Sequence, residues 1–345
     1  MLRSLEAQFA VETVRRAAQL VLQVQAELVP EAIRKEDRSP VTVADFASQA
    51  MVSARLAAAY PDDPLVAEED AGALRSADAD ATLGQIVTFV GREMPGATGD
   101  DVCCWIDHGR CEPAGRFWCL DPIDGTKGFL RGDQFAVALA LIVDGRVELG
   151  VLGCPNLCGP REDDGDAGRG GRGNEPGEDE WDHRGVLVVA ARGEGAWSAP
   201  LHDGDGPLRS LRVSAAQDPA GARLLRSFES GHTNVDQVDR LADRLGTNVE
   251  PVRMDSQAKY AVLAAGEGDV LVRLLSPARP DYRERIWDQA AGSIIVEEAG
   301  GRVSDLDGRA LDFTAGRTLA RNRGIVATNG HLHGALLDAV RAIGA

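Results

Sequence analysis

Two short apolar runs in this sequence end directly in acidic residues, and this pattern strongly constrains the fold. Leu65–Ala67 runs into the acids Glu68–Asp70, and Phe117–Leu120 runs into Asp121. A carboxylate that follows a buried strand is held on rigid backbone and points into the crevice outside the sheet. The sequence therefore predicts acidic side chains gathered at the end of a sheet.

The segment Asp121–Thr126 restricts its own backbone. Pro122 has a fixed φ and no N–H, while Gly125 permits a tight bend. The two aspartates can then converge, with the carbonyl of Ile123 turned inward between them. Such oxygen ligands suit Mg²⁺, whose charge would offset the repulsion between the carboxylates. A structural alternative stays open here, in which the aspartates are turn residues and Glu68 is a surface acid.

The composition narrows the class of protein. The chain has 345 residues, with 37 Lys and Arg against 54 Asp and Glu, and a formal net charge of −17. At about 150 residues per domain, two domains are expected. No apolar run reaches the roughly 18 residues that a membrane span needs, and the acidic balance argues against binding of a nucleic-acid polymer. An acidic protein that handles a phosphorylated small molecule needs metal ions or a local basic pocket.

The cysteines and the N-terminus favour a cytoplasmic protein. All 6 cysteines lie between Cys103 and Cys158, without a repeated Cys-x-x-Cys pair, so we expect reduced thiols. The N-terminus has no signal-peptide apolar core. An organelle remains open if a transit peptide is absent from this sequence.

Helical spacing of apolar residues predicts an amphipathic helix over 5–28, stopped by Pro30. Val41–Asp45 leads into a second predicted helix that ends near Ala59. Asp45 is a candidate N-cap of that helix, because its side-chain oxygen can accept free backbone N–H groups.

A hairpin is predicted over 135–152, with Asp144-Gly145 at its turn. Residues 159–184 contain seven glycines, nine acids and one large apolar residue, Trp181. Such a segment buries too little apolar surface to offset its ordering entropy, so we expect a mobile acidic loop. It would separate an N-terminal domain, 1–158, from a C-terminal domain, 185–345.

The second half alternates strands and helices. Strands are expected at 185–191, 224–228, 269–275 and 325–328, and helices at 235–245, after 255–259, at 288–299 and from about Leu332.

Three segments resemble the metal-site motifs of the lithium-sensitive, Mg²⁺-dependent inositol monophosphatase superfamily: Ala67–Asp70, Leu120–Thr126 and Ile286–Gly292. Other segments are similar to its 3'(2'),5'-bisphosphate nucleotidase branch, and the resemblance spans almost the whole chain. These segments are Phe117–Gln134, Ser39–Thr42, Gly153–Asn156 and Asp255–Tyr260.

The resemblance implies two to three Mg²⁺ ions. Glu68, Asp121 and the Ile123 carbonyl would hold one ion, and Asp121, Asp124 and Asp288 a second. Glu68 would share a third, weaker site through waters. Small residues after Asp288 would let the start of a helix approach the site and attract phosphate.

The resemblance also implies the catalytic pair. Thr126 would hydrogen-bond the attacking water, and Asp45 would polarise Thr126. A threonine hydroxyl alone is too weak a base, so a partner carboxylate is needed.

For the substrate, Ser256 and Lys259 are three residues apart and are expected on one helical face. Lys259 and Arg273 would supply positive charge for a second phosphate, the one that is not hydrolysed. The role of Lys127 stays open. The resemblance assigns substrate binding to Thr126, His232, Ser256, Lys259 and Arg273.

The implied fold is a layered αβαβα sugar-phosphatase fold, with an N-terminal α+β half that carries most metal ligands and a C-terminal α/β half. The implied enzyme is a phosphoric monoester hydrolase that converts adenosine 3',5'-bisphosphate to AMP and phosphate. 3'-Phosphoadenylyl sulfate is a further expected substrate, with lithium inhibition and a place in sulfur metabolism.

Two alternatives stay open. The first keeps the chemistry and changes the substrate to inositol 1,4-bisphosphate, inositol monophosphate or fructose 1,6-bisphosphate. The second is a nucleotide-binding sensor with little catalysis. The sequence leaves the oligomeric state open.

Overall fold

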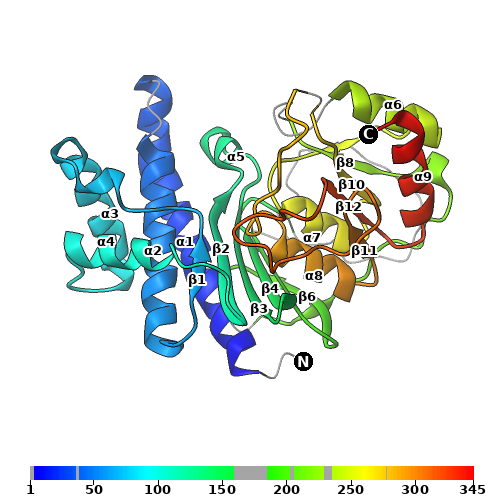
Figure 1. Ribbon diagram of the computed structural model, residues 1–345. Helices are drawn as coiled ribbons and strands as arrows, with labels where there is room; N and C mark the ends of the chain where they lie inside the picture. Colours follow the sequence, from blue (N-terminus) through cyan, green and yellow to red (C-terminus); the bar gives the residue numbers. More distant parts are fainter. Residues whose placement is uncertain (1–3, 36–38, 159–184, 203–205, 229–234, 277) are drawn as a thin grey trace.

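The fold, seen in a computed structural model, has five layers (Figure 1). It is described for residues 4–35, 39–158, 185–202, 206–228, 235–276 and 278–345. Helices and sheets alternate, which confirms the predicted αβαβα layering. In order, the layers are α1 (Leu5–Lys35) with α2 (Ser39–Ala59), a seven-stranded sheet, α7 (Ala258–Ala264) with α8 (Ala290–Glu298), a five-stranded sheet, and α6 (Val235–Leu245) with α9 (His333–Ile343).

The seven-stranded sheet follows chain order from β1 to β7. Its first two strands are parallel and the other neighbours are antiparallel. The predicted hairpin is confirmed, with Asp144 at φ 49° and Gly145 at φ 76° in its turn. The strands are β1 (Leu65–Ala67), β2 (Arg116–Asp124), β3 (Ala136–Val143), β4 (Arg146–Cys154), β5 (Val186–Ala191), β6 (Gly195–Pro200) and β7 (Arg209–Ser210).

The seven-stranded sheet contains strands from both sides of the expected domain boundary. Strands β4 and β5, on either side of 159–184, are neighbours in one sheet, with Cys154 opposite Val186. The N–H of Gly185 also donates to the carbonyl of Leu157 at 3.1 Å. The chain passes from the seven-stranded sheet to the five-stranded sheet between Ser210 and Leu224. The expected mobile loop itself lies outside the described residues.

The five-stranded sheet has the order β11-β12-β10-β8-β9. Strands β8, β9 and β10 are parallel, and β12 runs antiparallel to both of its neighbours. All the strands and helices expected in the second half are present, several of them with shorter ends. The strands are β8 (Leu224–Arg226), β9 (Val252–Arg253), β10 (Val270–Arg273), β11 (Arg302–Ser304) and β12 (Ile325–Thr328).

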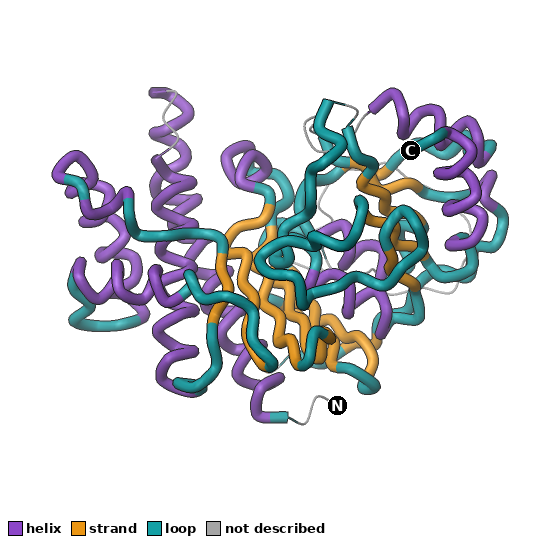
Figure 2. The backbone as a smooth tube through the Cα atoms, viewed as in Figure 1, coloured by secondary structure: helices purple, strands orange, loops and turns teal. Residues whose placement is uncertain are grey.

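Three apolar cores lie between the layers, and strand alternation assigns side chains to them. In β2, Trp118 and Leu120 face α1 and α2, whereas Phe117 and Cys119 face the core shared with α7 and α8. A third core joins the outer face of the small sheet to α6 and α9. Figure 2 shows the strands of both sheets between these helical layers. Because side chains alternate along a strand, a sheet covered on both faces needs apolar residues at every position.

The first two helices correct the sequence prediction at their ends. Helix α1 continues through Pro30 to Lys35. A proline removes only one intrahelical donor, so a helix can continue past it at a cost of about 3 kcal/mol. Helix α2 begins at Ser39, so Asp45 lies inside the helix and is not its N-cap.

Two shorter helices, α3 (Asp80–Glu93) and α4 (Gly99–His108), pack on the outer side of α2. A capping box between Thr98 and Asp101 fixes the start of α4. Among the described helices, none combines the length and the apolar character needed to cross a bilayer.

Candidate active site

The parallel pairing of β1 and β2 brings the first two acids together. Ala67 lies opposite Leu120, so the next residues, Glu68 and Asp121, emerge at the same end of adjacent strands. Each carboxyl group is close enough to shift the pKa of the other. The acids that follow the two strands thus gather as the sequence predicted.

An irregularity in β2 brings Asp124 to the same place. Asp121 pairs with Ala138 and Asp124 with Ala136, so three steps along β2 oppose two along β3. The extra residue leaves the ladder where Pro122 has no N–H to donate. The hydroxyl of Ser48 on α2 donates to the carbonyl of Pro122 at 3.1 Å and holds the bulged segment.

One face of α2 lies against the ends of β1 and β2. Gln49 Nε2 donates to the carbonyl of Glu69 at 2.7 Å, and Gln49 Oε1 accepts from the Glu69 N–H at 3.0 Å. One turn earlier, Asp45 is buried, and its Oδ1 has no hydrogen-bond partner among the described residues. The interior of a helix, rather than its cap, therefore carries the Asp45 carboxyl toward the acidic cluster.

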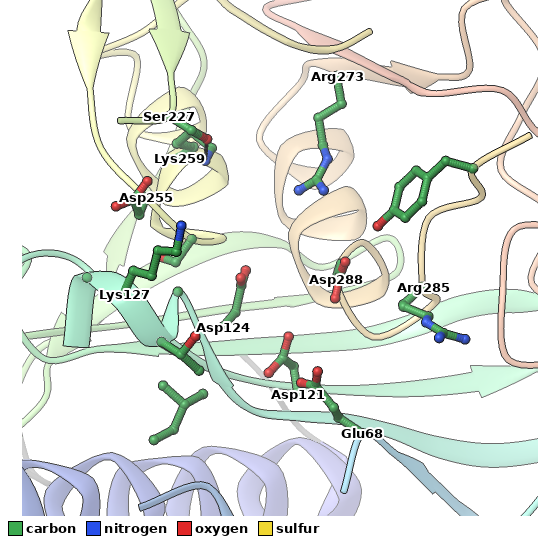
Figure 3. Close-up of a pocket in the computed structure, with 16 residues that line it drawn as sticks. Glu68, Asp121, Asp124, Lys127, Ser227, Asp255, Lys259, Arg273, Arg285 and Asp288 are labelled. Atoms are coloured by element: carbon green, nitrogen blue, oxygen red, sulfur yellow. Dashed lines mark hydrogen bonds between the residues drawn. The ribbon is translucent and has the colours of Figure 1, made fainter. Parts of the chain in front are cut away.

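These acids line a pocket of about 320 Å³ between the two sheets (Figure 3). Carboxylates of Glu68, Asp121, Asp124 and Asp288 gather on one side, and Lys127, Lys259 and Arg273 approach from the other sides. Among the predicted site residues, the pocket brings together Glu68, Asp121, Ile123, Asp124, Thr126, Ser256, Lys259, Arg273 and Asp288.

The carboxylates of the pocket repel one another. Burial, together with the neighbouring acids, raises the pKa of Asp121 and Asp288 well above the ordinary value. The same causes raise the pKa of Glu68 to about 7. Burial also raises the pKa of Asp124, although Lys259 opposes the shift. A bound cation would relieve this repulsion.

The donor set fits a hard divalent cation. All the candidate side-chain ligands are carboxylates, and Asp121 Oδ1 is buried without a partner in the described part of the chain. Within that same part, no three His, Cys, Asp or Glu side chains already converge closely enough to hold an ion by themselves. The ions would therefore draw the carboxylates together and would also need main-chain, water or phosphate oxygens.

The predicted helical face of Ser256 and Lys259 is wrong. Helix α7 begins at Ala258, and Ser256 precedes it with φ 67°, in the left-handed region. This conformation lets the next N–H, that of Gln257, donate to Asp124 Oδ2 at 2.7 Å. Gly125 allows the approach, because a Cβ there would lie 2.8 Å from Ser256 Cβ.

Helix α8 begins at Ala290, so Asp288 lies just before it rather than in its first turn. Gln257 also reaches this segment: its Nε2 donates to the carbonyl of Trp287 at 3.0 Å. The N–H of Gly292 donates to Gln257 Oε1 at 3.1 Å. Asp288 is thus fixed relative to Asp124 through one buried residue.

Two cations, the buried Lys259 and the half-buried Arg273, lie opposite the acids. Lys259 is 5% exposed, and its Nζ donates to Ser227 Oγ at 2.8 Å. Burial and the nearby Arg273 lower the pKa of Lys259 to about 8. For Arg273, burial acts to lower the pKa, but the charges of Glu284 and Asp288 outweigh it and raise the pKa. Arg273 is therefore a permanent positive charge, whereas Lys259 titrates close to neutrality.

Lys127, whose role the sequence left open, points into the pocket. Arg285, which sequence reasoning missed, lies beside Glu68. It directly precedes the Ile286–Gly292 segment, a signal that could have identified it. Ser227 and Tyr282 also line the pocket without any such signal, whereas Asp255 belongs to the Asp255–Tyr260 segment. The predicted substrate residue His232 lies outside the described residues.

Known proteins similar to this chain indicate what kind of protein carries this pocket. The model of the inositol monophosphatase family matches residues 3–345. The chain belongs to the inositol monophosphatase family. A curated relative from Oryza sativa, named 3'(2'),5'-bisphosphate nucleotidase, is 42% identical over 96% of this chain and 92% of its own length. A Schizosaccharomyces pombe protein of the same name is 37% identical over 98% of this chain and 95% of its own.

Solved structures of other proteins share the fold. Mycobacterium tuberculosis SuhB aligns with a TM-score of 0.60 at 21% identity, over 98% of this chain and 96% of its own. CysQ from Bacteroides thetaiotaomicron, a bacterial member of the family, aligns with a TM-score of 0.56 at 18% identity, over 94% of this chain and 97% of its own. The predicted resemblance, the fold class and the assignment as an enzyme, a phosphatase, are confirmed.

Proposed function

We propose that this enzyme is a Mg²⁺-dependent 3'(2'),5'-bisphosphate nucleotidase that removes the 3'-phosphate of adenosine 3',5'-bisphosphate and releases AMP and phosphate. The observation that carries the proposal is the opposition of four carboxylates to Lys259 and Arg273 across one pocket. A substrate with two phosphates can place one at the acidic side through metal ions and the other at the basic side. The name of the 42% identical relative supports the nucleotide as substrate.

Glu68, Asp121, Asp124, Asp288 and the Ile123 carbonyl would hold two to three Mg²⁺ ions. When bound, these ions supply Lewis acidity and lower the pKa of water at the reacting phosphate. The carboxylates themselves bind no phosphate, because their charge repels it.

Thr126, the first residue of α5 (Thr126–Arg131), is proposed to orient the attacking water through its hydroxyl. Asp45 is proposed to accept the Thr126 proton. Its buried position raises the pKa of its carboxyl well above the usual value, which increases its basicity once it is ionised.

On the basic side, Lys259 and Arg273 are proposed to hold the phosphate that is not transferred. Arginine offers a planar pair of donors and lysine a compact charge. Ser256 and, from outside the described residues, His232 would complete the contacts to the nucleotide. 3'-Phosphoadenylyl sulfate presents the same 3'-phosphate and is a second proposed substrate.

The test is phosphate release from adenosine 3',5'-bisphosphate with and without Mg²⁺, and with added Li⁺. Inositol 1,4-bisphosphate, inositol monophosphate and fructose 1,6-bisphosphate are assayed alongside. We expect the nucleotide to have the highest kcat/KM, chelation to abolish turnover and Li⁺ to inhibit it. A sugar or inositol phosphate turned over faster would refute the nucleotide assignment, and Mg²⁺-dependent nucleotide binding without phosphate release would identify a sensor.

A further inference from the structure

A carboxylate outside the proposed metal ligands is buried behind Arg273. Glu284 is 4% exposed and lies between β10 and α8. Its Oε2 is 2.9 Å from Arg273 Nη2. The same oxygen accepts a hydrogen bond from Gln289 Nε2 at 3.1 Å. The carboxylate is therefore held by an amide while it pairs with the guanidinium.

The amide that holds Glu284 is itself fixed. The hydroxyl of Tyr260, on α7, donates to Gln289 Oε1. Tyr260 and Gln289 are both almost fully buried, at 3% and 0% exposure. A relay of polar groups thus runs from α7 through the start of α8 to Arg273. Buried polar networks of this kind restrict side-chain direction when every member is paired.

This relay constrains where the guanidinium of Arg273 can go. Asp288 and Asp124 also act on Arg273 through their charges. A guanidinium without its pairing partner would have these carboxylates as alternatives, and turning toward them would remove it from the basic side of the pocket. Glu284 binds Nη2, so the remaining donors of the fork stay available for an anion.

We propose that Glu284 is a positioning residue that directs Arg273 toward the phosphate that is not transferred and so sets a preference for substrates with two phosphates. This inference rests on the proposed function. Removal of the Glu284 charge would have opposite effects under two explanations. If Glu284 acted mainly by repelling the phosphate, its removal would strengthen phosphate binding. If Glu284 acts mainly by positioning Arg273, its removal weakens phosphate binding.

The experiment compares wild-type enzyme with Glu284→Gln, which keeps the shape of the side chain. KM and kcat are measured for adenosine 3',5'-bisphosphate and for 3'-AMP, which lacks the second phosphate. We expect KM for the bisphosphate to rise about tenfold, the effect of losing one charge-assisted hydrogen bond, while kcat and the KM for 3'-AMP change less than about twofold. An unchanged or lower KM for the bisphosphate, or equal rises for both substrates, would overturn the inference.

A matched control separates positioning from general loosening. Asp269, just before the same strand β10, pairs with Arg223 at 2.8 Å, away from the pocket. Asp269→Asn should lower the melting temperature at least as much as Glu284→Gln without changing the ratio of the two KM values. If it changes that ratio equally, Glu284 has only a structural role. In an Arg273→Ala background, Glu284→Gln should have no further effect on KM.

The affinity for AMP, measured by calorimetry, distinguishes failure of this inference from failure of the proposed function. We expect wild-type enzyme to bind AMP about tenfold more tightly than Glu284→Gln. If the wild-type enzyme binds AMP more tightly than Glu284→Gln but does not hydrolyse the bisphosphate, only the proposed function is refuted. If the wild-type enzyme hydrolyses the bisphosphate and both proteins bind AMP equally well, only the positioning role is refuted.

Discussion

The backbone N–H of Gln257 donates to Asp124 Oδ2 at 2.7 Å and joins the end of the large sheet to the segment that leads into α7. The side chain of Gln257 continues the connection to the Trp287 carbonyl and the Gly292 N–H. Two proposed metal ligands, Asp124 and Asp288, are therefore spaced by a residue that is itself neither a proposed metal ligand nor a proposed substrate contact.

Gln257→Leu should destabilise the fold and weaken metal binding. It leaves a buried carbonyl and a buried N–H unpaired, which costs about 2–4 kcal/mol for the two groups. Urea unfolding measures the loss, and calorimetry measures Mg²⁺ affinity. Gln257→Glu keeps the acceptor for Gly292 and should lose less stability. A Leu variant with wild-type stability and Mg²⁺ affinity would show that Gln257 does not set the spacing.

Asp121→Asn should abolish turnover and stabilise the metal-free protein. Removal of one group that stabilises charge in a transition state costs about 10²–10³-fold in kcat. Asp121 is 2% exposed among other acids, so loss of its charge also relieves repulsion. Steady-state assays with Mg²⁺ and melting curves in chelator measure both effects. The exposed acid Asp62 is the control, since Asp62→Asn should change neither. Retained turnover would contradict the metal-clamp assignment.

The stability of the metal-free protein should fall as pH rises from about 4.5 toward about 7. The pKa of Glu68 is raised from 4.5 to about 7 by burial and neighbouring acids. Between these values the folded protein binds more protons than the unfolded chain, so deprotonation disfavours folding. Asp121, Asp124 and Asp288 shift in the same direction.

Unfolding experiments in chelator across this pH range measure how steeply the free energy of unfolding changes with pH. Saturating Mg²⁺ should reduce or reverse it, because the ion binds the ionised carboxylates. Identical slopes with and without Mg²⁺ would mean that the four carboxylates do not bind the ion.

Nucleotide affinity should decrease from about pH 7 to about pH 9 as Lys259 loses its proton. The pKa of Lys259 is lowered to about 8 by burial and by Arg273, and a bound phosphate would favour the charged form. The dissociation constant of AMP, measured across this range, should rise about tenfold.

Lys259→Ala should remove this pH dependence. It should also damage turnover of the bisphosphate more than turnover of 3'-AMP. Arg273→Ala should show the same substrate bias but move the pH dependence to higher pH, because Arg273 does not titrate there and its charge lowers the pKa of Lys259. Equal damage to both substrates would argue against a phosphate site at Lys259.

Much of the acidic side of the pocket could be predicted from local sequence. Glu68 and Asp121 follow apolar runs that form adjacent parallel strands. Whether the two acids lie together therefore depends only on the pairing of β1 with β2. The bend between Asp121 and Asp124 follows from Pro122 and Gly125. These features rest on backbone chemistry within a few residues.

The basic side depends on contacts that no local pattern encodes. Ser256 adopts a left-handed backbone conformation although it is not glycine, and this places Gln257 against Asp124. Glu284 gains its role only because the loop before α8 returns to Arg273. The prediction that Ser256 and Lys259 share one helical face failed because these tertiary contacts outweigh helical propensity.

The joining of β4 to β5 has a consequence for how this chain tolerates change. Cys154 and Val186 are neighbours across the ladder, so the chain leaves the sheet and re-enters it at one place. The 26 positions of 159–184, within this connection, can differ in number or composition without altering the distance that the flanking strands must span. A reporter protein could be grafted between Leu157 and Gly185 while the catalytic machinery stays intact.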